Sequence, residues 1–197
     1  MDTAPLAQRE PLAYLEQVAQ DCLDLKALIR TVPDFPKPGI LFRDITTLLR
    51  DPQGFHHCVE QLATAVAPYR FHRIVGIESR GFIIGAALAQ RLGAGFVAIR
   101  KPGKLPAENF RQDYELEYGS DRLEIHADSL DRDEHVLLVD DLLATGGTAL
   151  AACRLIETAG GRVAACGFVI ELEGLPGRNR LETLPVPVVT LMGFGDG

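Results

Sequence analysis

The sequence predicts an α/β fold with a mostly parallel central sheet and helices on both of its faces. Three observations lead to this prediction. Short continuous apolar runs, typical of buried strands, alternate with stretches of helical periodicity along most of the chain. Turn residues, above all glycine, separate the two kinds of segment. The length of 197 residues, of which 47% are hydrophobic, suffices for a domain with its own core.

The first part of the chain is predicted to be helical and then irregular. Residues 11–31 carry apolar side chains at helical spacing. Three prolines and a glycine within residues 33–39 end this helix and require an extended, turn-rich segment. A further helix is predicted over about 52–67, because proline is favoured in the first turn of a helix.

The rest of the chain is predicted to alternate between strands and helices. Such an alternation is typical of a parallel sheet. One exception is the stretch around Gly119 and Ser120, where polar and apolar residues alternate and indicate a hairpin outside the sheet. In chain order we expect a strand over 73–78, a turn at 79–81, a helix over 82–92, a strand over 95–101, a loop over 102–113, hairpin strands over 114–118 and 122–127, a strand over 135–139, a helix over 147–159, a strand over 162–171 and a short strand over 187–192.

Composition disfavours several classes of protein. The net charge is −7, from 20 basic and 27 acidic residues, and general nucleic-acid binding needs a basic surface. The four cysteines form no CxxC pair and match no zinc pattern, so we expect reduced thiols in a cytoplasmic protein. No window is apolar enough to span a membrane, and the acidic N-terminus does not resemble a signal peptide. We therefore expect no membrane partner.

The most informative segment is VLLVDDLLATGGT, residues 136–148. An apolar strand is followed by two adjacent carboxylates, Asp140 and Asp141, at its carboxyl end, where ligands bind in open α/β sheets. A small, glycine-rich loop then enters a helix, and the free backbone N–H groups of such a loop form an anion site. The segment therefore predicts a phosphate site made by Ala144, Thr145, Gly146, Gly147 and Thr148.

The two acids indicate more than a phosphate. Carboxylates beside a phosphate need a partner, and sugar hydroxyls or a divalent metal would supply one. A ribose phosphate is therefore the ligand that fits Asp140, Asp141 and the loop together. The alternative is a strand that ends in a solvated pair of aspartates, followed by a simple Gly-Gly turn. The loop is not a Walker A motif, because it lacks the GK[ST] ending.

Segment 136–148 resembles the phosphoribosyl pyrophosphate (PRPP) motif of the type I phosphoribosyltransferases. Four more segments resemble the adenine-specific branch of that family in the right order: DFPKPGILFRDIT, GIESRGFIIG, IRKPGKLP and LEYGSDRLEIH. The resemblance covers about residues 23–192. It implies a single domain over 23–197 with a base-binding hood at about 31–47 and a flexible hairpin lid at about 102–127, preceded by a helical N-terminal extension over 1–22.

The resemblance also implies a reaction, in which the 5-phosphoribosyl group of PRPP passes to adenine and gives AMP and pyrophosphate, a step of purine salvage. The cofactor would be Mg²⁺, held mainly by PRPP and water near Asp140 and Asp141. These acids would hold the ribose hydroxyls, and loop 144–148 would hold the 5′-phosphate. A non-proline cis peptide is expected at Glu78–Ser79. The residues that bind pyrophosphate would be Ser79, Arg80, Arg100, Lys101 and Lys104. A homodimer is expected, in which one or more of the last three residues reach the site of the neighbouring subunit.

The same resemblance implies which residues bind adenine and which residue transfers a proton. Leu41 and Arg43 would recognise adenine partly through main-chain groups, with Phe42 against the ring. Glu117 would act as the acid or base on the purine. Without the resemblance, the first segment would be a proline-rich crossover with Phe42 as core filler. Glu117 would then lie on the solvated face of a hairpin.

Two other functions stay open at this point. One is a PRPP-sensing regulator without catalysis, and the other is a transferase for another 6-amino purine. An acid stands at the position of Ala144 in the 6-oxopurine enzymes, so the methyl group here disfavours hypoxanthine and guanine. Outside these segments, Arg178, Asn179 and Arg180 are expected in a solvated turn, and Cys153 and Cys166 are expected to be buried.

Overall fold

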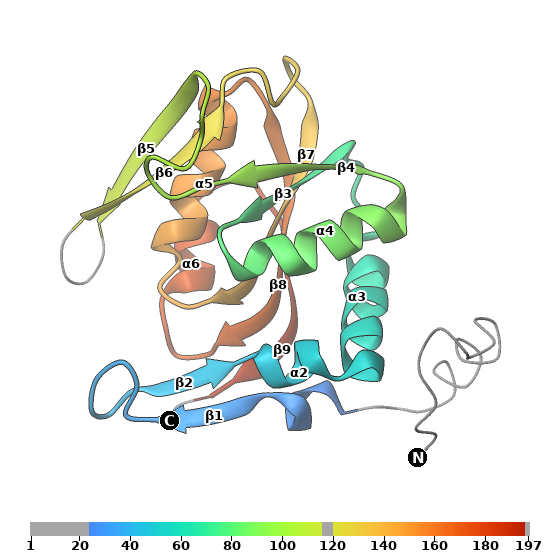
Figure 1. The fold of residues 1–197 in the computed structure, drawn as a ribbon, viewed down its shortest axis with the longest axis vertical. Helices are drawn as coiled ribbons and strands as arrows, with labels where there is room; N and C mark the ends of the chain where they lie inside the picture. The colour runs from blue at the N-terminus through green and yellow to red at the C-terminus, as the bar shows by residue number, and fades with distance from the viewer. Residues whose placement is uncertain (1–23, 116–119, 196–197) are drawn as a thin grey trace. The chain divides into compact units, whose positions relative to one another are not determined.

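The computed structural model describes residues 24–115 and 120–195 of the chain (Figure 1). The described chain separates into two compact units, with the boundary between Cys58 and Val59. Each unit is described by itself. Within the described residues, no helix has both the length and the apolar character needed to cross a lipid bilayer.

The first unit is a small antiparallel hairpin followed by helix. Its two strands pair so that Arg30 lies opposite Asp44 and Val32 opposite Phe42. Arg30 donates to the Asp44 carboxylate, and this contact lowers the pKa of Asp44 to about 2. Its elements are a 3-10 helix over Leu25–Leu28, β1 over Arg30–Pro33, β2 over Leu41–Asp44, α2 over Thr46–Arg50 and the first part of α3, which spans Pro52–Val66.

The helix predicted over 11–31 is wrong where the structure describes it. Residues 25–28 form a single 3-10 turn that Asp24 caps, and the chain is already a strand from Arg30. Branched side chains such as Thr31 and Val32 favour the extended backbone, and pairing with β2 decides the outcome. The remainder of that prediction lies outside the described residues. The helix predicted over about 52–67 is confirmed as α3.

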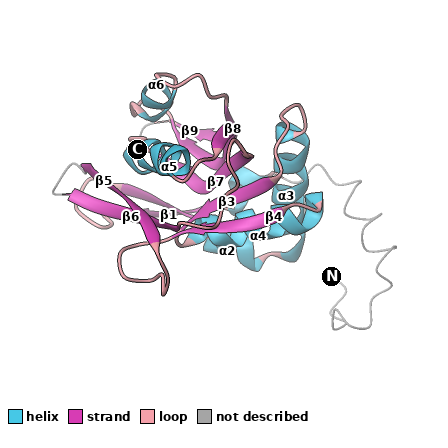
Figure 2. Cartoon of the chain, turned by 90° about the horizontal axis from the view of Figure 1, so that it is seen from above, coloured by secondary structure: helices cyan, strands magenta, loops and turns pink. Residues whose placement is uncertain are grey.

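The second unit contains a five-stranded, wholly parallel sheet with the order β4-β3-β7-β8-β9. Helices α4 and α5 cover opposite faces of this sheet (Figure 2), so the predicted α/β architecture is confirmed. The elements are β3 over Arg73–Ile77, α4 over Arg80–Leu92, β4 over Gly95–Ile99, β7 over His135–Leu143, α5 over Gly147–Thr158, β8 over Arg162–Leu172, α6 over Gly177–Leu181 and β9 over Val188–Phe194.

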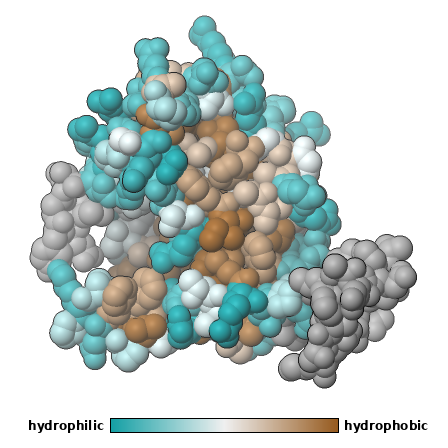
Figure 3. All heavy atoms as spheres, viewed as in Figure 1, coloured by the Kyte–Doolittle hydropathy of each residue, from teal (hydrophilic) through white to brown (hydrophobic). Residues whose placement is uncertain are grey.

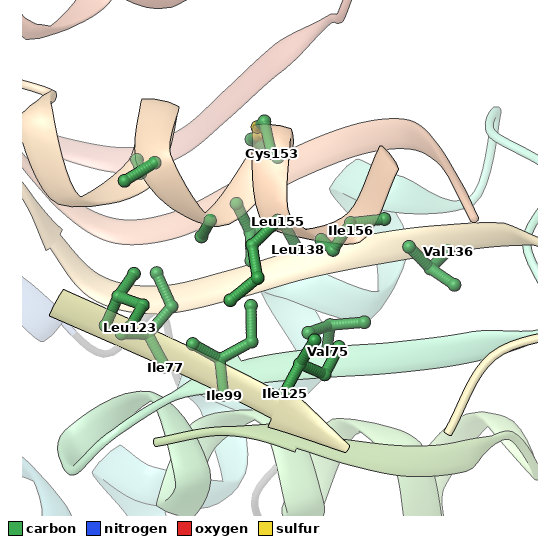
Figure 4. Packing of buried hydrophobic residues seen from close by; sticks show 14 of the residues in the cluster. Val75, Ile77, Ile99, Leu123, Ile125, Val136, Leu138, Cys153, Leu155 and Ile156 are labelled. Atoms are coloured by element: carbon green, nitrogen blue, oxygen red, sulfur yellow. The ribbon is translucent and has the colours of Figure 1, made fainter. Parts of the chain in front are cut away.

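The two faces of the sheet are packed differently. On one face, Val75, Ile77 and Leu138 point toward α5 and form the main core, shown in Figure 4. On the other face, glycines let α4 approach closely. An added Cβ on Gly76 would lie 2.8 Å from Gly81 O, and one on Gly85 would lie 2.9 Å from the Phe96 ring. Because alternate strand residues face opposite sides, one strand serves both layers.

A hairpin is present as predicted, with β5 over Asn109–Glu115 and β6 over Ser120–His126. Residues 116–118 of its first predicted strand lie outside the described residues. Leu123 and Ile125 of β6 are buried in the main core, and Arg100 bridges to Glu124 at the end of β4. The loop predicted over 102–113 is too long, because β5 begins at Asn109. Pairing with β6 makes this segment a strand, although it lacks a clear pattern of its own.

Candidate functional site

The loop predicted to bind phosphate connects β7 with α5. Gly146 is the N-cap of α5, with φ +76° and ψ 0°, and its carbonyl accepts from the N–H of Leu150 at 2.9 Å. The first N–H groups of a helix have no partner within it, so they are available to an anion. Ala144, Thr145, Gly147 and Thr148 are only partly buried. The structure therefore places the five loop residues at an accessible helix N-terminus.

The two acids lie inside β7, which continues through Leu143, and not at the strand end expected from the sequence. Adjacent strand residues face opposite ways, so their surroundings differ. Asp141 is 4% exposed, and its Oδ2 lies 2.6 Å from Arg80 Nε. Asp140 is partly buried, and its Oδ1 accepts from the Asp141 N–H at 2.9 Å. The reading of this pair as solvated is therefore wrong.

The environments of the two acids give Asp140 an unusual protonation behaviour. Burial, and then the charge of Asp141, hold the pKa of Asp140 well above its ordinary value. Arg80 pairs directly with Asp141 and acts on Asp140 only as a weaker opposing charge. Asp141 is thus paired with a cation. The raised pKa of Asp140 reflects the unfavourable energy of a second negative charge beside it.

The turn at 79–81 lies directly beside these acids. The peptide bond between Glu78 and Ser79 is cis, as the family resemblance implied. Helix α4 begins at Arg80, two residues earlier than predicted, with Ser79 at its N-cap. An added Cβ on Gly81 would lie 2.8 Å from both Asp140 Oδ1 and Val139 O. This close approach brings Ser79, Arg80, Asp140 and Asp141 together.

The basic residues after β4 are organised by the carboxylate of Glu78, a residue for which the sequence predicted only a cis peptide bond. Arg100 Nε donates to Glu78 Oε2 at 3.0 Å, and the Lys101 N–H donates to the same oxygen at 2.9 Å. The Arg100 contact lowers the pKa of Glu78. Lys101 Nζ donates to Tyr114 at 2.9 Å and to Asp121, both on the hairpin. Lys104 is exposed.

A pocket of about 570 Å³ opens beside the loop. Thr145 and Gly147 line it, together with the β5 residues that include Tyr114. Two arginines, Arg154 and Arg180, also line it. Asp113 of β5 lines the pocket as well, so an anionic ligand at the loop would meet one carboxylate besides the cations of α5 and α6.

The residues predicted to bind adenine belong to the first unit. Leu41, Phe42 and Arg43 are the first three residues of β2, and all three are partly buried. The Phe42 ring meets Phe35 edge-on at 5.1 Å, and Arg43 Nη1 donates to Thr31 Oγ1 at 2.5 Å. Within the described residues β2 pairs only with β1, so its other edge has no strand partner.

Three other predictions about side chains have different outcomes. Glu117, the candidate acid or base, lies outside the described residues. The solvated turn expected at Arg178 to Arg180 is wrong in two respects, because these residues belong to α6 and Arg178 binds Glu171 through two hydrogen bonds. Asn179 and Arg180 are exposed as expected. The hydrogen-bond partners of Arg178 lie on strands β8 and β9, so no local sequence signal could have identified them. Cys153 and Cys166 are buried as expected, with their Sγ atoms 3.7 Å apart.

Comparison with protein families places this geometry in a known class. The model of the phosphoribosyl transferase domain matches residues 47–183, which include strands β3, β4, β7 and β8, the two acids and the loop, whereas β9 lies beyond them. The fold is therefore that of a phosphoribosyltransferase.

Comparison with individual relatives shows to which group of phosphoribosyltransferases the chain is similar. The adenine phosphoribosyltransferase of Synechococcus is 58% identical over 172 residues, which are 87% of this chain and 99% of the relative. That of Parvibaculum lavamentivorans is 56% identical over 87% and 98% of the two chains. The crystal structure of the Thermoanaerobacter pseudethanolicus enzyme has a TM-score of 0.84 at 49% identity and covers 87% and 98%. This chain belongs to the adenine phosphoribosyltransferases.

Proposed function

We propose that the cluster around the end of β7 is the site at which this chain carries out its reaction. The chain transfers the 5-phosphoribosyl group of PRPP to adenine and gives AMP and pyrophosphate, a step of purine salvage. The observation that carries the site assignment is the close approach of the Ser79–Arg80 turn to Asp140 and Asp141, next to loop 144–148.

In this proposal the loop holds the 5′-phosphate and the acids hold the ribose. The free N–H groups at the start of α5 and the hydroxyls of Thr145 and Thr148 donate to phosphate oxygens. Asp140 accepts hydrogen bonds from the ribose hydroxyls, while Asp141 stays paired with Arg80. The partly buried setting strengthens these contacts, because charged hydrogen bonds gain where water is excluded.

Pyrophosphate binding is assigned to the cations around Glu78. Ser79 and Arg80 contact it from the start of α4, and Arg100, Lys101 and Lys104 add positive charge. Arg100 and Lys101 already have acidic partners, Glu78 and Asp121, so the ligand competes with these carboxylates. Such a paired resting state keeps the cations in place before PRPP arrives.

Mg²⁺ fits this site as a metal carried by the substrate. Within the described residues, no three metal-ligating side chains lie together, so the chain offers no complete cage. Carboxylates are suitable oxygen ligands, and Mg²⁺ usually keeps several waters and substrate phosphates. Asp140 and Asp141 would therefore meet a metal whose other ligands come from PRPP and water. The metal would offset negative charge on the departing pyrophosphate.

The adenine site is assigned to β2. The N6 amino group of adenine donates and its N1 accepts, and the open edge of an extended strand presents the complementary carbonyl and N–H. Leu41 and Arg43 would supply these main-chain groups, and Phe42 would lie against the ring. The yeast adenine phosphoribosyltransferase, 41% identical with a TM-score of 0.79, has been solved with adenine and an iminoaltritol bisphosphate, over 90% of this chain and 99% of that one.

A test of base specificity decides between the functions that the sequence left open. The purified chain is incubated with PRPP and Mg²⁺, and adenine, hypoxanthine, guanine and orotate are added separately while nucleotide and pyrophosphate are measured. We expect AMP from adenine alone. Product from hypoxanthine or guanine would contradict the argument from Ala144. PRPP binding without product from any base would favour the regulator.

Glu117 is proposed as the group that acts on the purine nitrogens. Glu117→Gln should lower kcat by about a hundredfold with little change in either KM, because an amide keeps the size but cannot transfer the proton. Steady-state kinetics at saturating PRPP measures this. Glu115→Gln, a neighbouring acid of the same hairpin, is the matched control. A rise in KM at unchanged kcat would exclude the acid/base role.

The raised pKa of Asp140 predicts a pH dependence with opposite signs for binding and stability. Ribose hydroxyls donate to the ionised carboxylate, so PRPP affinity should fall as the pH drops through this pKa. A raised folded pKa also means that the folded state loses stability as the pH rises from the unfolded value to the folded one. Asp140→Asn should therefore weaken PRPP binding yet raise the Tm at neutral pH.

Both effects are measurable together. PRPP titrations and thermal melts of the wild type and Asp140→Asn are compared between about pH 5 and pH 8. The variant corrects for ionisation of PRPP itself, because that ionisation is common to both proteins. An identical pH profile of binding in the two proteins would contradict the role of Asp140.

A homodimer and a cytoplasmic location are also proposed. Helix α4 and edge strand β4 expose the apolar side chains of Ile83, Leu92 and Phe96, and Figure 3 shows a hydrophobic area over this helix. A second copy of the chain is the partner we assign to this face, which light scattering of the purified protein tests. The unbonded Cys153–Cys166 pair supports a reducing compartment.

A further inference from the structure

Gly177, the first residue of α6, lies directly against the phosphate loop. An added Cβ on Gly177 would lie 2.1 Å from Ala144 O and 3.0 Å from Leu143 Cγ. An added Cβ on Gly146 would lie 2.8 Å from Gly177 O. Backbone therefore meets backbone here, without room for a side chain on either side. The position of Gly177 limits where the loop can lie.

Helix α6 cannot hold this position by itself. It has only five residues, and its N-cap, Pro176, makes no side-chain hydrogen bond. Helices this short are not stable in isolation, because nucleation costs more than a few hydrogen bonds return. Packing of α6 near α5 (Figure 1) and the burial of Leu181 contribute. The place of α6 is thus set by its tertiary contacts.

The strongest polar contact is made by Arg178, the residue that follows Gly177. Its Nε donates to Glu171 Oε1 at 2.8 Å, and its Nη2 donates to Glu171 Oε2 at 2.5 Å. Nη2 also donates to Thr190 Oγ1 at 3.1 Å, and Nη1 donates to Val188 O at 3.3 Å. Thr190 Oγ1 in turn donates to Glu171 Oε2 at 3.0 Å. One guanidinium therefore ties α6 to both β8 and β9.

The geometry of this network suits arginine in particular. A planar guanidinium can donate two parallel bonds to one carboxylate and still reach further acceptors, whereas lysine cannot. The Glu171 side chain is 14% exposed and that of Arg178 is 36% exposed, so the carboxylate is the more buried partner. The Arg178 contact lowers the pKa of Glu171, as expected for a bound carboxylate. Both partners are therefore charged over the neutral pH range.

We propose that Arg178 is a positioning residue for PRPP: by binding Glu171 and Thr190 it holds the Gly177 backbone against loop 144–146, and so fixes the direction of the N–H groups that receive the 5′-phosphate. The inference rests on the phosphate role proposed for that loop. It goes beyond that role, because the hydrogen bonds of Arg178 go to Glu171, Val188 and Thr190 and not to the loop itself. A misplaced binding group can cost a large factor in rate or affinity even when it is still present.

The test compares variants of α6 by kinetics, PRPP titration and thermal melting. Arg178→Ala should raise the KM and Kd for PRPP about tenfold. The KM for adenine at saturating PRPP should stay unchanged, and kcat should change by no more than about twofold. Arg178→Lys should be intermediate, because it keeps the charge and loses the two-bond geometry. Asn179→Ala is the matched control, since Asn179 is exposed on the same short helix.

Each outcome bears on the proposal. Wild-type PRPP affinity in Arg178→Ala, with only a lower Tm, would show a purely stabilising role and overturn it. An equal loss in Asn179→Ala would overturn it as well. If Arg178→Ala does not fold, Arg178→Lys and Glu171→Gln decide by the same measurements. Thr145→Ala is tested in parallel, and normal PRPP binding there would instead remove the phosphate role of the loop.

Discussion

Gly146→Ala should lower PRPP affinity by more than about a hundredfold, the largest effect expected for so small a change. The residue has φ +76°, a region that costs an alanine about 1 kcal/mol. The added methyl group would also lie 2.8 Å from Gly177 O and 2.9 Å from Gly177 Cα. Both atoms are backbone of a buried residue, so the loop must move, and the phosphate N–H groups move with it.

A second glycine separates the effect of the positive φ from the effect of the close contact with Gly177. Gly93, at the end of α4, has φ +66°, and an added Cβ there would meet nothing within 4 Å. Gly93→Ala should show the conformational cost alone, as a lower Tm with unchanged PRPP binding. Isothermal titration with PRPP and thermal melts of both variants give the comparison. PRPP binding of wild-type strength by Gly146→Ala would refute the phosphate cradle.

Asp140→Asn combined with Asp141→Asn should lower kcat/KM by about a thousandfold. The first change turns an acceptor for the ribose hydroxyls into an amide that also donates. The second removes the carboxylate that Arg80 contacts at 2.6 Å, and so removes one contact that holds this cation beside the site. The Asp141 side chain is only 6% exposed, whereas Arg80 is 40% exposed, so the expected loss comes mainly from the changed position of Arg80.

Net charge is controlled by a matched double variant. Asp131→Asn with Asp133→Asn changes the charge by the same amount in the turn before β7, where both side chains are largely exposed. Its kcat/KM should equal that of the wild type. The single variants then separate the roles, since only Asp141→Asn acts through Arg80. Intact PRPP affinity and turnover in the Asp140, Asp141 double variant would show that the ribose assignment is wrong.

The sequence determined those features whose cause lies within a few residues. The apolar run before Asp140 and the glycine turn after it predict a strand, a loop and a helix, and all three are present. The alternating pattern predicts the β5–β6 hairpin in the same way. The five-stranded sheet follows from the order of such segments, because short crossovers leave few topologies. Family membership could be inferred from the motifs for the same reason.

Only the tertiary structure decided which charges meet. Residues 30 and 31, the end of the predicted helix, are part of strand β1, because pairing with β2 outweighed their helical spacing. Asp141 is paired and Asp140 is not, because α4 places Arg80 beside one of two adjacent acids. Arg178 reaches Glu171 and Thr190 across two strands, which no spacing along the chain announces. Local patterns set backbone conformation, whereas pairing of charges depends on distances that arise only once the chain has folded.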